Sequence, residues 1–178
     1  MRIEQAHDEI VFGTKEVDFY VPLRISYKEN DQEGKELLYY QCLNKYASLI
    51  EISINSATKR IVEITLVTVN DETEINNSLL NELKVPCLEG NPIVDTTCFD
   101  KEHVVTDRKN YNIFRAKKKI YAMQADGIVE HKMRIDDVEL LLDNENNVVG
   151  YIFDGFSNDE WDEINESIDN SLKTAASN

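Results

Sequence analysis

Residues 138–165, VELLLDNENNVVGYIFDGFSNDEWDEIN, run through an apolar segment, a polar turn, a second apolar segment and the start of a helix. Residues 50–77, IEISINSATKRIVEITLVTVNDETEINN, repeat this order. Aligned without a gap at a shift of 88, the two segments are identical at six of 28 positions: Glu51/Glu139, Ile64/Ile152, Asn70/Asn158, Asp71/Asp159, Glu72/Glu160 and Asn77/Asn165. Repeated supersecondary units usually pack their apolar faces together. The repeat therefore predicts two related halves, residues 1–90 and 91–178, within one compact domain.

The periods of the apolar residues predict the fold class. They indicate strands in the apolar segments, and the helical spacing that follows each second segment indicates a helix. We expect an α+β fold with antiparallel sheets built from two hairpin–helix units, and helices near residues 71–83 and 158–172 packed on the sheet faces. The second helix has the stronger signals, a capping box of Ser157 with Glu160 and one apolar stripe formed by Trp161, Ile164, Ile168 and Leu172.

Several further strands are expected outside the repeat. Residues 19–27 alternate in polarity, and Pro22 within them predicts a sheet edge or a bulge. Residues 37–43 and 61–69 are also typical of strands, the latter a central one because it is apolar or neutral on both faces. Residues 111–123 read as one strand whose basic cluster favours an edge strand protected by charge over an anion site; the cluster is Arg115, Lys117, Lys118 and Lys119. Asp126-Gly127 predicts a hairpin turn into the next strand.

Composition limits the class of protein. The chain has 178 residues, of which 42% are hydrophobic, which indicates a globular domain. It contains no apolar run of about 18 residues, and its first residues lack the apolar core of a secretory signal, so we expect a cytoplasmic protein and no membrane partner. The three cysteines are odd in number and have no paired spacing, which predicts neither a disulfide framework nor a cysteine zinc site.

Charge is the strongest global feature. The formal net charge is −15. Residues 134–178 hold 12 acidic and two basic residues, or −10, and the other 133 residues contribute −5. Nucleic acid is therefore an unfavourable direct partner, because phosphates need a basic surface. The concentration of acids serves either solubility or binding of a basic partner.

Candidate chemistry is sparse. Asp95, Cys98, Asp100 and His103 lie close together in an irregular segment, and a cysteine with a histidine can form a nucleophile and base. No third orienting group or oxyanion site is visible, so we predict no catalytic residues. The turn at residues 143–147 offers oxygen ligands but lacks the glycine and the distal glutamate of a calcium loop, so a plain hairpin turn is favoured. No phosphate-binding glycine loop is present, and no metal or cofactor is expected.

The strand–turn–strand segments IEISINSATKRIVEITLV and VELLLDNENNVVGYIF, the turns rich in Asn and Asp, and the acidic C-terminal helix resemble, at the level of a class, the immunity proteins that bacteria make against polymorphic or contact-dependent toxins. This resemblance implies a small acidic cytoplasmic protein that covers the active site of a toxin, often a basic nuclease. It implies no particular site residue.

The charge distribution itself predicts the partner-binding residues: Asp143, Glu145, Asp159, Asp162, Glu163 and Glu166. Their expected partner is a protein, such as a basic toxin domain, and the sequence leaves the oligomeric state open. Two alternatives remain at this point. One is a structural or regulatory module that associates with itself through the repeated hairpins, and the other is a small enzyme that uses the Asp95–His103 loop.

Overall fold

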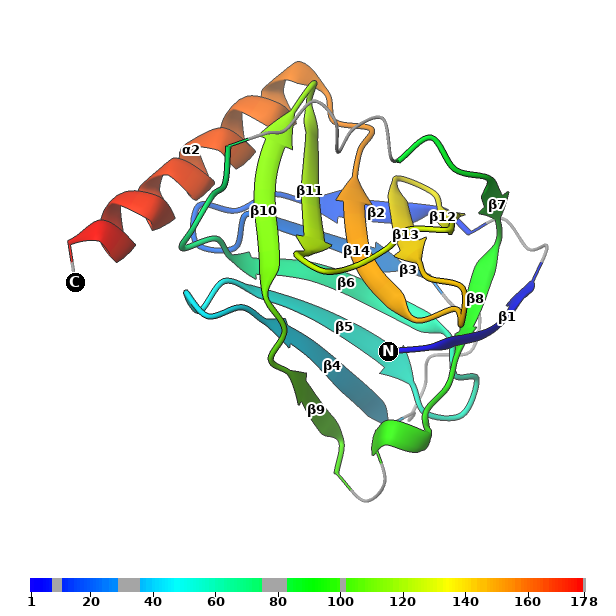
Figure 1. Cartoon of the computed structure of the whole chain (residues 1–178). Helices are drawn as coiled ribbons and strands as arrows, with labels where there is room; N and C mark the ends of the chain where they lie inside the picture. Colours follow the sequence, from blue (N-terminus) through cyan, green and yellow to red (C-terminus); the bar gives the residue numbers. More distant parts are fainter. Residues whose placement is uncertain (8–10, 29–35, 75–82, 100–101, 178) are drawn as a thin grey trace.

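Two six-stranded sheets form the body of the protein. The computed structural model describes residues 1–7, 11–28, 36–74, 83–99 and 102–177. Sheet I contains, in spatial order, β2 (Gly13–Glu16), β3 (Leu23–Tyr27), β6 (Ile61–Thr68), β5 (Leu49–Asn55), β4 (Leu37–Leu43) and β9 (Val104–Asp107). Sheet II contains β10 (Tyr111–Ala116), β11 (Lys119–Gln124), β14 (Val148–Phe153), β13 (Val138–Leu142), β12 (His131–Ile135) and β7 (Cys87–Glu89). Figure 1 shows the two sheets as two layers of a β-sandwich.

The inner faces of the two sheets share one hydrophobic core. Side chains that are 0% exposed come from both layers and belong to one cluster: Ile25, Ile52, Ile64 and Leu66 from sheet I, and Leu140, Leu142, Tyr151 and Phe153 from sheet II. Fully burying such a side chain contributes about 1.5–3 kcal/mol. Polar contacts also join the layers. The Tyr27 hydroxyl donates to the Ile135 carbonyl at 3.3 Å, and Cys42 Sγ lies 3.4 Å from the Tyr151 hydroxyl.

The two sheets have the same topology. The order β2-β3-β6-β5-β4 in sheet I corresponds strand for strand to β10-β11-β14-β13-β12 in sheet II. Each sheet also has a break in register at the equivalent place, between Ser53 and Ile54 in β5 and between Leu141 and Leu142 in β13. The strands of the internal repeat predicted from the sequence are therefore present in both sheets, and their correspondence extends over five strands of each sheet.

The repeat requires one gap, which the ungapped alignment missed. Asn55 N donates to the Arg60 carbonyl across the β5–β6 turn, whereas Asp143 N donates to the Asn147 carbonyl across the β13–β14 turn. The second turn is one residue shorter. β13 therefore aligns with β5 at a shift of 88 residues, whereas β14 aligns with β6 at a shift of 87 residues. The structural counterpart of Ile64 is therefore Tyr151, because both pair across from the equivalent residues of β5 and β13.

The two sequence halves are interlocked. The β7 strand lies in residues 1–90 but pairs in parallel with β12 of sheet II. The β9 strand lies in residues 91–178 but pairs in parallel with β4 of sheet I. A small third sheet joins β1 (Ile3–His7) with β8 (Asn91–Val94), again across the two halves. Each half therefore completes the other.

The predicted α+β class with helices on sheet faces is wrong. The protein is mostly β, with 49% strand and 14% helix. The described residues hold one α-helix, α2 (Asn158–Ala176), and the short 3-10 helix η1 (Thr97–Phe99). The physical reason is that the two sheets cover each other's apolar faces, so α2 lies along one side of the sandwich instead (Figure 1). The other helix, expected near residues 71–83, falls largely on residues 75–82, which lie outside the described residues.

The strand expected over residues 111–123 is two strands. Lys117 and Lys118 have φ values of 51° and 57° and form the turn between β10 and β11, so they do not lie along an edge strand. β11 then pairs with β14 rather than with β12, which means that Asp126-Gly127 is not a hairpin turn. The reason is burial, because β11 gains an apolar neighbour on each side. The strand expected from residue 19 begins at Leu23, directly after Pro22, and β2 takes the edge beside it.

No helix in the described ranges combines the length and the apolar character that crossing a membrane requires.

Candidate functional site

The α2 helix is fixed to the sandwich by its apolar face. Ser157 caps it, since the Ser157 hydroxyl accepts from Glu160 N at 3.2 Å and Ser157 N donates to the Glu160 carboxylate at 2.7 Å. Ile164 and Ile168 are 0% exposed within the shared core, and Trp161 packs against that core with its ring stacked on Phe156. The capping box and the apolar stripe predicted from the sequence are therefore confirmed.

The opposite face of α2 carries four carboxylates, which we call the acidic stripe: Asp159, Asp162, Glu163 and Glu166. Their spacing of three, four and seven residues places them side by side on one helix face. All four are exposed, and none forms an ion pair among the described residues. Like charges at this spacing destabilise a helix slightly, by a few tenths of a kcal/mol per pair. Asp159 lies in the first turn, where its charge complements the positive end of the helix dipole, but the fold gains nothing from the grouping of Asp162 with Glu163 and Glu166.

Aromatic side chains lie beside α2 on one flank. The Ser167 hydroxyl donates to the Phe19 carbonyl at 2.9 Å, which joins α2 to the segment between β2 and β3. Phe19 and the adjacent Tyr20 are 47% and 82% exposed, and their rings meet edge to face with centroids 5.3 Å apart. Exposed aromatic residues beside a charged surface are typical of protein-binding sites.

Arg115 contacts α2 on its other flank. Its guanidinium donates to both carboxylate oxygens of Glu72 at 2.8 Å, to Asn165 Oδ1 at 2.8 Å and to Asp169 at 2.7 Å. The hydrogen bonding to the Glu72 carboxylate is the largest of the effects that raise the pKa of Arg115. Because Arg115 stands on β10 and Phe19 beside sheet I, these two contacts tie α2 to both layers of the sandwich. The helix is a rigid support for the acidic stripe.

The structure brings together four of the six predicted binding residues and separates the other two. Asp143 and Glu145 lie in the β13–β14 turn, at the opposite end of β14 from α2. The six residues of β14 span about 20 Å, so the two groups do not form one face. Asp143 also has a structural task, because its Oδ1 accepts from Glu145 N and Asn147 N at 2.9 and 2.8 Å. Burial opposes ionisation of Asp143, but the Asn147 and Glu145 hydrogen bonds outweigh it and lower its pKa.

Many other acids of the C-terminal quarter are paired within the fold. Asp137 lies 2.8 Å from Lys15, Glu139 lies 2.7 Å from Lys132, and Asp154 pairs with Lys119. Asp136 accepts a hydrogen bond from Gly13 N at 2.9 Å. The raw charge of residues 134–178 therefore overstates the charge available to a partner, and the acidic stripe is its largest unpaired group among the described residues.

The Asp95–His103 loop is not assembled as a catalytic site. Asp95 and Cys98 line a hollow of about 340 Å³ together with Tyr40 and Asp107. His103 instead faces Glu36, with Nε2 3.3 Å from Glu36 Oε1, and Asp100 lies outside the described residues. Burial raises the pKa of the Cys98 thiol, whereas a nucleophilic cysteine needs a lowered pKa. In the described ranges no three His, Cys, Asp or Glu side chains are grouped to hold a metal ion.

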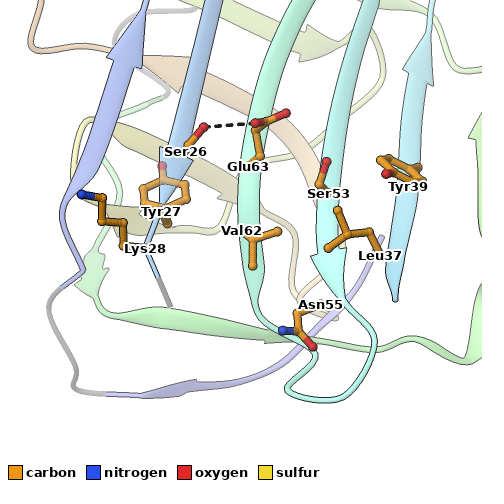
Figure 2. A pocket seen from close by; sticks show the side chains of 9 residues that line it. All are labelled: Ser26, Tyr27, Lys28, Leu37, Tyr39, Ser53, Asn55, Val62 and Glu63. Carbon is orange, nitrogen blue, oxygen red and sulfur yellow. Dashed lines mark hydrogen bonds between the residues drawn. The ribbon is translucent and has the colours of Figure 1, made fainter. Parts of the chain in front are cut away.

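A polar hollow on the outer face of sheet I was missed by the sequence reasoning. It has a volume of about 460 Å³, and Figure 2 shows the nine side chains that line it: Ser26, Tyr27, Lys28, Leu37, Tyr39, Ser53, Asn55, Val62 and Glu63. The Glu63 carboxylate accepts from the Ser26 hydroxyl at 3.0 Å and from the Thr65 hydroxyl at 3.2 Å. Polar residues at outward positions of strands look like an ordinary solvated face, so the sequence alone gave no reason to single them out.

The fold and its two surface features define a β-sandwich with an internal duplication, a helix that presents carboxylates, and a polar hollow on one sheet. No family model matches the sequence, and no curated protein matches it either. The fold alone does not define the function, because a sandwich fold supports many unrelated activities.

Proposed function

We propose that the protein is a binding protein that neutralises a basic protein partner through the acidic stripe of α2. The observation that carries this proposal is the set of four exposed, unpaired carboxylates on one face of a helix that is anchored to both sheets. Electrostatic complementarity of this kind speeds association and suppresses wrong partners. The neighbouring Phe19–Tyr20 pair supplies the apolar contact that a purely charged surface lacks.

The class of partner follows from charge. The stripe fits a surface rich in lysine and arginine, such as the nucleic-acid-binding cleft of a nuclease, where it would take the place of phosphates. With the resemblance to immunity proteins, this makes a cytoplasmic toxin inhibitor the preferred function. Asp143 and Glu145 lie outside the proposed face.

A charge-reversal experiment tests the docking face. The triple variant Asp162→Lys/Glu163→Lys/Glu166→Lys should slow association with a basic partner protein, for which the product of an adjacent gene is the candidate, by about tenfold or more at low salt, and should weaken the salt dependence of the rate. Stopped-flow or surface-binding kinetics at two salt concentrations measure both effects.

A control triple variant makes the same change in net charge elsewhere. Glu89, Glu102 and Asp126 are exposed and lie away from α2, so their replacement by lysine should change association much less. Equal slowing by both triple variants would show an effect of net charge alone, and unchanged association in the α2 variant would reject the acidic stripe.

The two alternative functions are less well supported. The geometry of Cys98 and His103 gives no support to an enzyme. Self-association through the repeated hairpins is disfavoured, because β5, β6, β13 and β14 are central strands whose edges are already paired.

A further inference from the structure

Because the two sheets are related by the internal duplication, the residues at equivalent positions on their outer faces can be compared. In sheet II this face is apolar, and its buried residues form a second hydrophobic cluster that includes Tyr121, Met123, Leu141 and Ile152. In sheet I the equivalent positions, fixed by the strand pairing, are Arg24, Ser26, Ser53 and Thr65. The same backbone arrangement therefore carries an apolar cluster in one half and a polar hollow in the other.

The central pair of each face shows how the hollow arises. Leu141 lies opposite Gly150 in sheet II, and Ser53 lies opposite Glu63 in sheet I. A Cβ at Gly150 would meet Leu141 Cδ1 at 2.9 Å and the Ala122 carbonyl at 2.7 Å, so leucine leaves no room for a side chain there. In sheet I the smaller Ser53 stands at the position of Leu141 and leaves this space free. The Glu63 side chain occupies part of the space. The remainder is the hollow.

Sheet II forms the same strand arrangement without these polar residues. Ser53 and Thr65 are only 4% and 6% exposed; the Thr65 hydroxyl donates to Glu63 at 3.2 Å, and the Ser53 side chain faces the hollow. The Ser53 hydroxyl makes no hydrogen bond to another described residue, although it lines the hollow. The sister sheet has Leu141 and Ile152 at the two equivalent positions. The free hydrogen-bonding capacity of Ser53 in the hollow is therefore available to a ligand.

We propose that the hollow binds a small neutral polyhydroxylated molecule, a sugar or a polyol. Its volume lies within the range of small-molecule sites, about 300–1,000 Å³. The Ser53 hydroxyl can donate and accept, and Glu63 retains acceptor capacity beyond its two hydroxyl donors. Val62, Leu37 and the Tyr39 ring offer apolar surface for the C–H groups of such a ligand (Figure 2).

Charge selects a neutral ligand over an ionic one. Glu63 repels a phosphate or carboxylate, whereas Lys28 at the hollow and Arg24, whose Nε lies 3.7 Å from Glu63 Oε1, repel a cation. Arg24 also pairs with Glu16 at 3.4 Å, so two carboxylates and two cations are balanced around the hollow. Hydroxyl groups can accept from the lysine and donate to the carboxylate without any charge of their own.

The test is an amide NMR titration of the full chain with maltose and with glucose, and with glucose 6-phosphate and lysine as charged comparators. Maltose or glucose should cause saturable shifts in amides of β3 to β6. The double variant Ser53→Leu/Glu63→Gly installs the residue pair that sheet II already uses, so it should fold and weaken binding by about tenfold or more. Glu63→Gln, which keeps the shape of the side chain, should weaken binding less.

Glu51→Gln is the matched control, because Glu51 lies on the same face of β5 outside the hollow and should leave the affinity unchanged within about twofold. Absence of saturable shifts with both neutral sugars would overturn the proposal. Preferential binding of a charged comparator, or undiminished binding in the double variant, would also overturn it.

Discussion

Glu139 is a nearly fully buried carboxylate that holds two neighbouring cations. It lies 2.7 Å from Lys132 Nζ and also pairs with Arg134. Its counterpart Glu51 accepts a hydrogen bond from Gln41 at 2.8 Å, so both halves place a donor from the adjacent strand beside this glutamate. Identity at this position therefore reflects a shared structural role.

Glu139→Gln should destabilise the protein by about 2 kcal/mol at pH 7, because it leaves the partly buried Lys132 without its counter-charge and Arg134 with only Asp154, 3.8 Å away. Burial opposes ionisation of Glu139, but the hydrogen bonds from Lys132 and Arg134 outweigh it and lower the pKa of the carboxyl. Its stabilisation is therefore present above the ordinary glutamate pKa and is lost as the pH falls through the lowered folded value. Urea unfolding between pH 7 and pH 3 should show a flatter pH dependence for this variant.

Glu51→Gln is the control for that experiment, since its donor is neutral and no ion pair is lost. A stability loss in Glu51→Gln as large as in Glu139→Gln would contradict the ion-pair explanation.

Trp161 begins the apolar stripe of α2 but is only partly buried. Its ring stacks on Phe156 at a centroid distance of 5.8 Å. Replacing a fully buried tryptophan by alanine lowers the free energy of unfolding by about 3 kcal/mol or more. Because Trp161 is only partly buried, we expect Trp161→Ala to lower it by about 2 kcal/mol. Chemical unfolding followed by far-ultraviolet circular dichroism measures this, and wild-type fluorescence emission should lie between that of buried and of free indole. Wild-type stability in the variant would identify Trp161 as an interface residue instead.

At the scale of elements, the β10–β11 hairpin uses an unfavourable turn sequence. Lys117 and Lys118 both adopt positive φ, which costs a non-glycine residue roughly 1 kcal/mol. Lys117→Asn/Lys118→Gly supplies the residues that this two-residue turn favours and should raise the free energy of unfolding by about 1 kcal/mol, even though Lys118 loses its contact with Asn158.

Thermal and urea unfolding measure that change. Lys173→Gly is a matched control, since Lys173 lies within α2 and glycine there should destabilise by up to about 1 kcal/mol. A destabilised turn variant would show that the Lys118 contact with α2 matters more than the backbone conformation.

At the scale of the whole molecule, the shared core and the exchanged strands β7 and β9 make the two halves one folding unit. We expect a single unfolding transition in calorimetry, with equal calorimetric and van't Hoff enthalpies. Residues 1–90 expressed alone should not fold stably, because they lack the inner face of sheet II and the β9 strand of sheet I. Two resolved transitions, or a dispersed NMR spectrum of the isolated fragment, would show that the halves are independent domains.

The sequence by itself determined the local features of the protein. The residues of β4, β13 and β14, the duplication, the capping box at Ser157 and the apolar stripe of α2 follow from periods and short-range hydrogen bonds, which nearby residues encode. The four carboxylates of the acidic stripe could also be found, since their spacing defines one helix face. Their role as a docking face stays a prediction.

Only the tertiary structure decided how these parts pair. The period of the apolar residues marks a buried face but does not say what covers it, so the packing of sheet on sheet in place of helix on sheet could not be read from the chain. Long-range pairing also separated Asp143 and Glu145 from α2 and exchanged β7 and β9 between the halves. It brought Ser26, Ser53 and Glu63 together into the hollow, because residues far apart in sequence meet only when strands from different hairpins share a sheet.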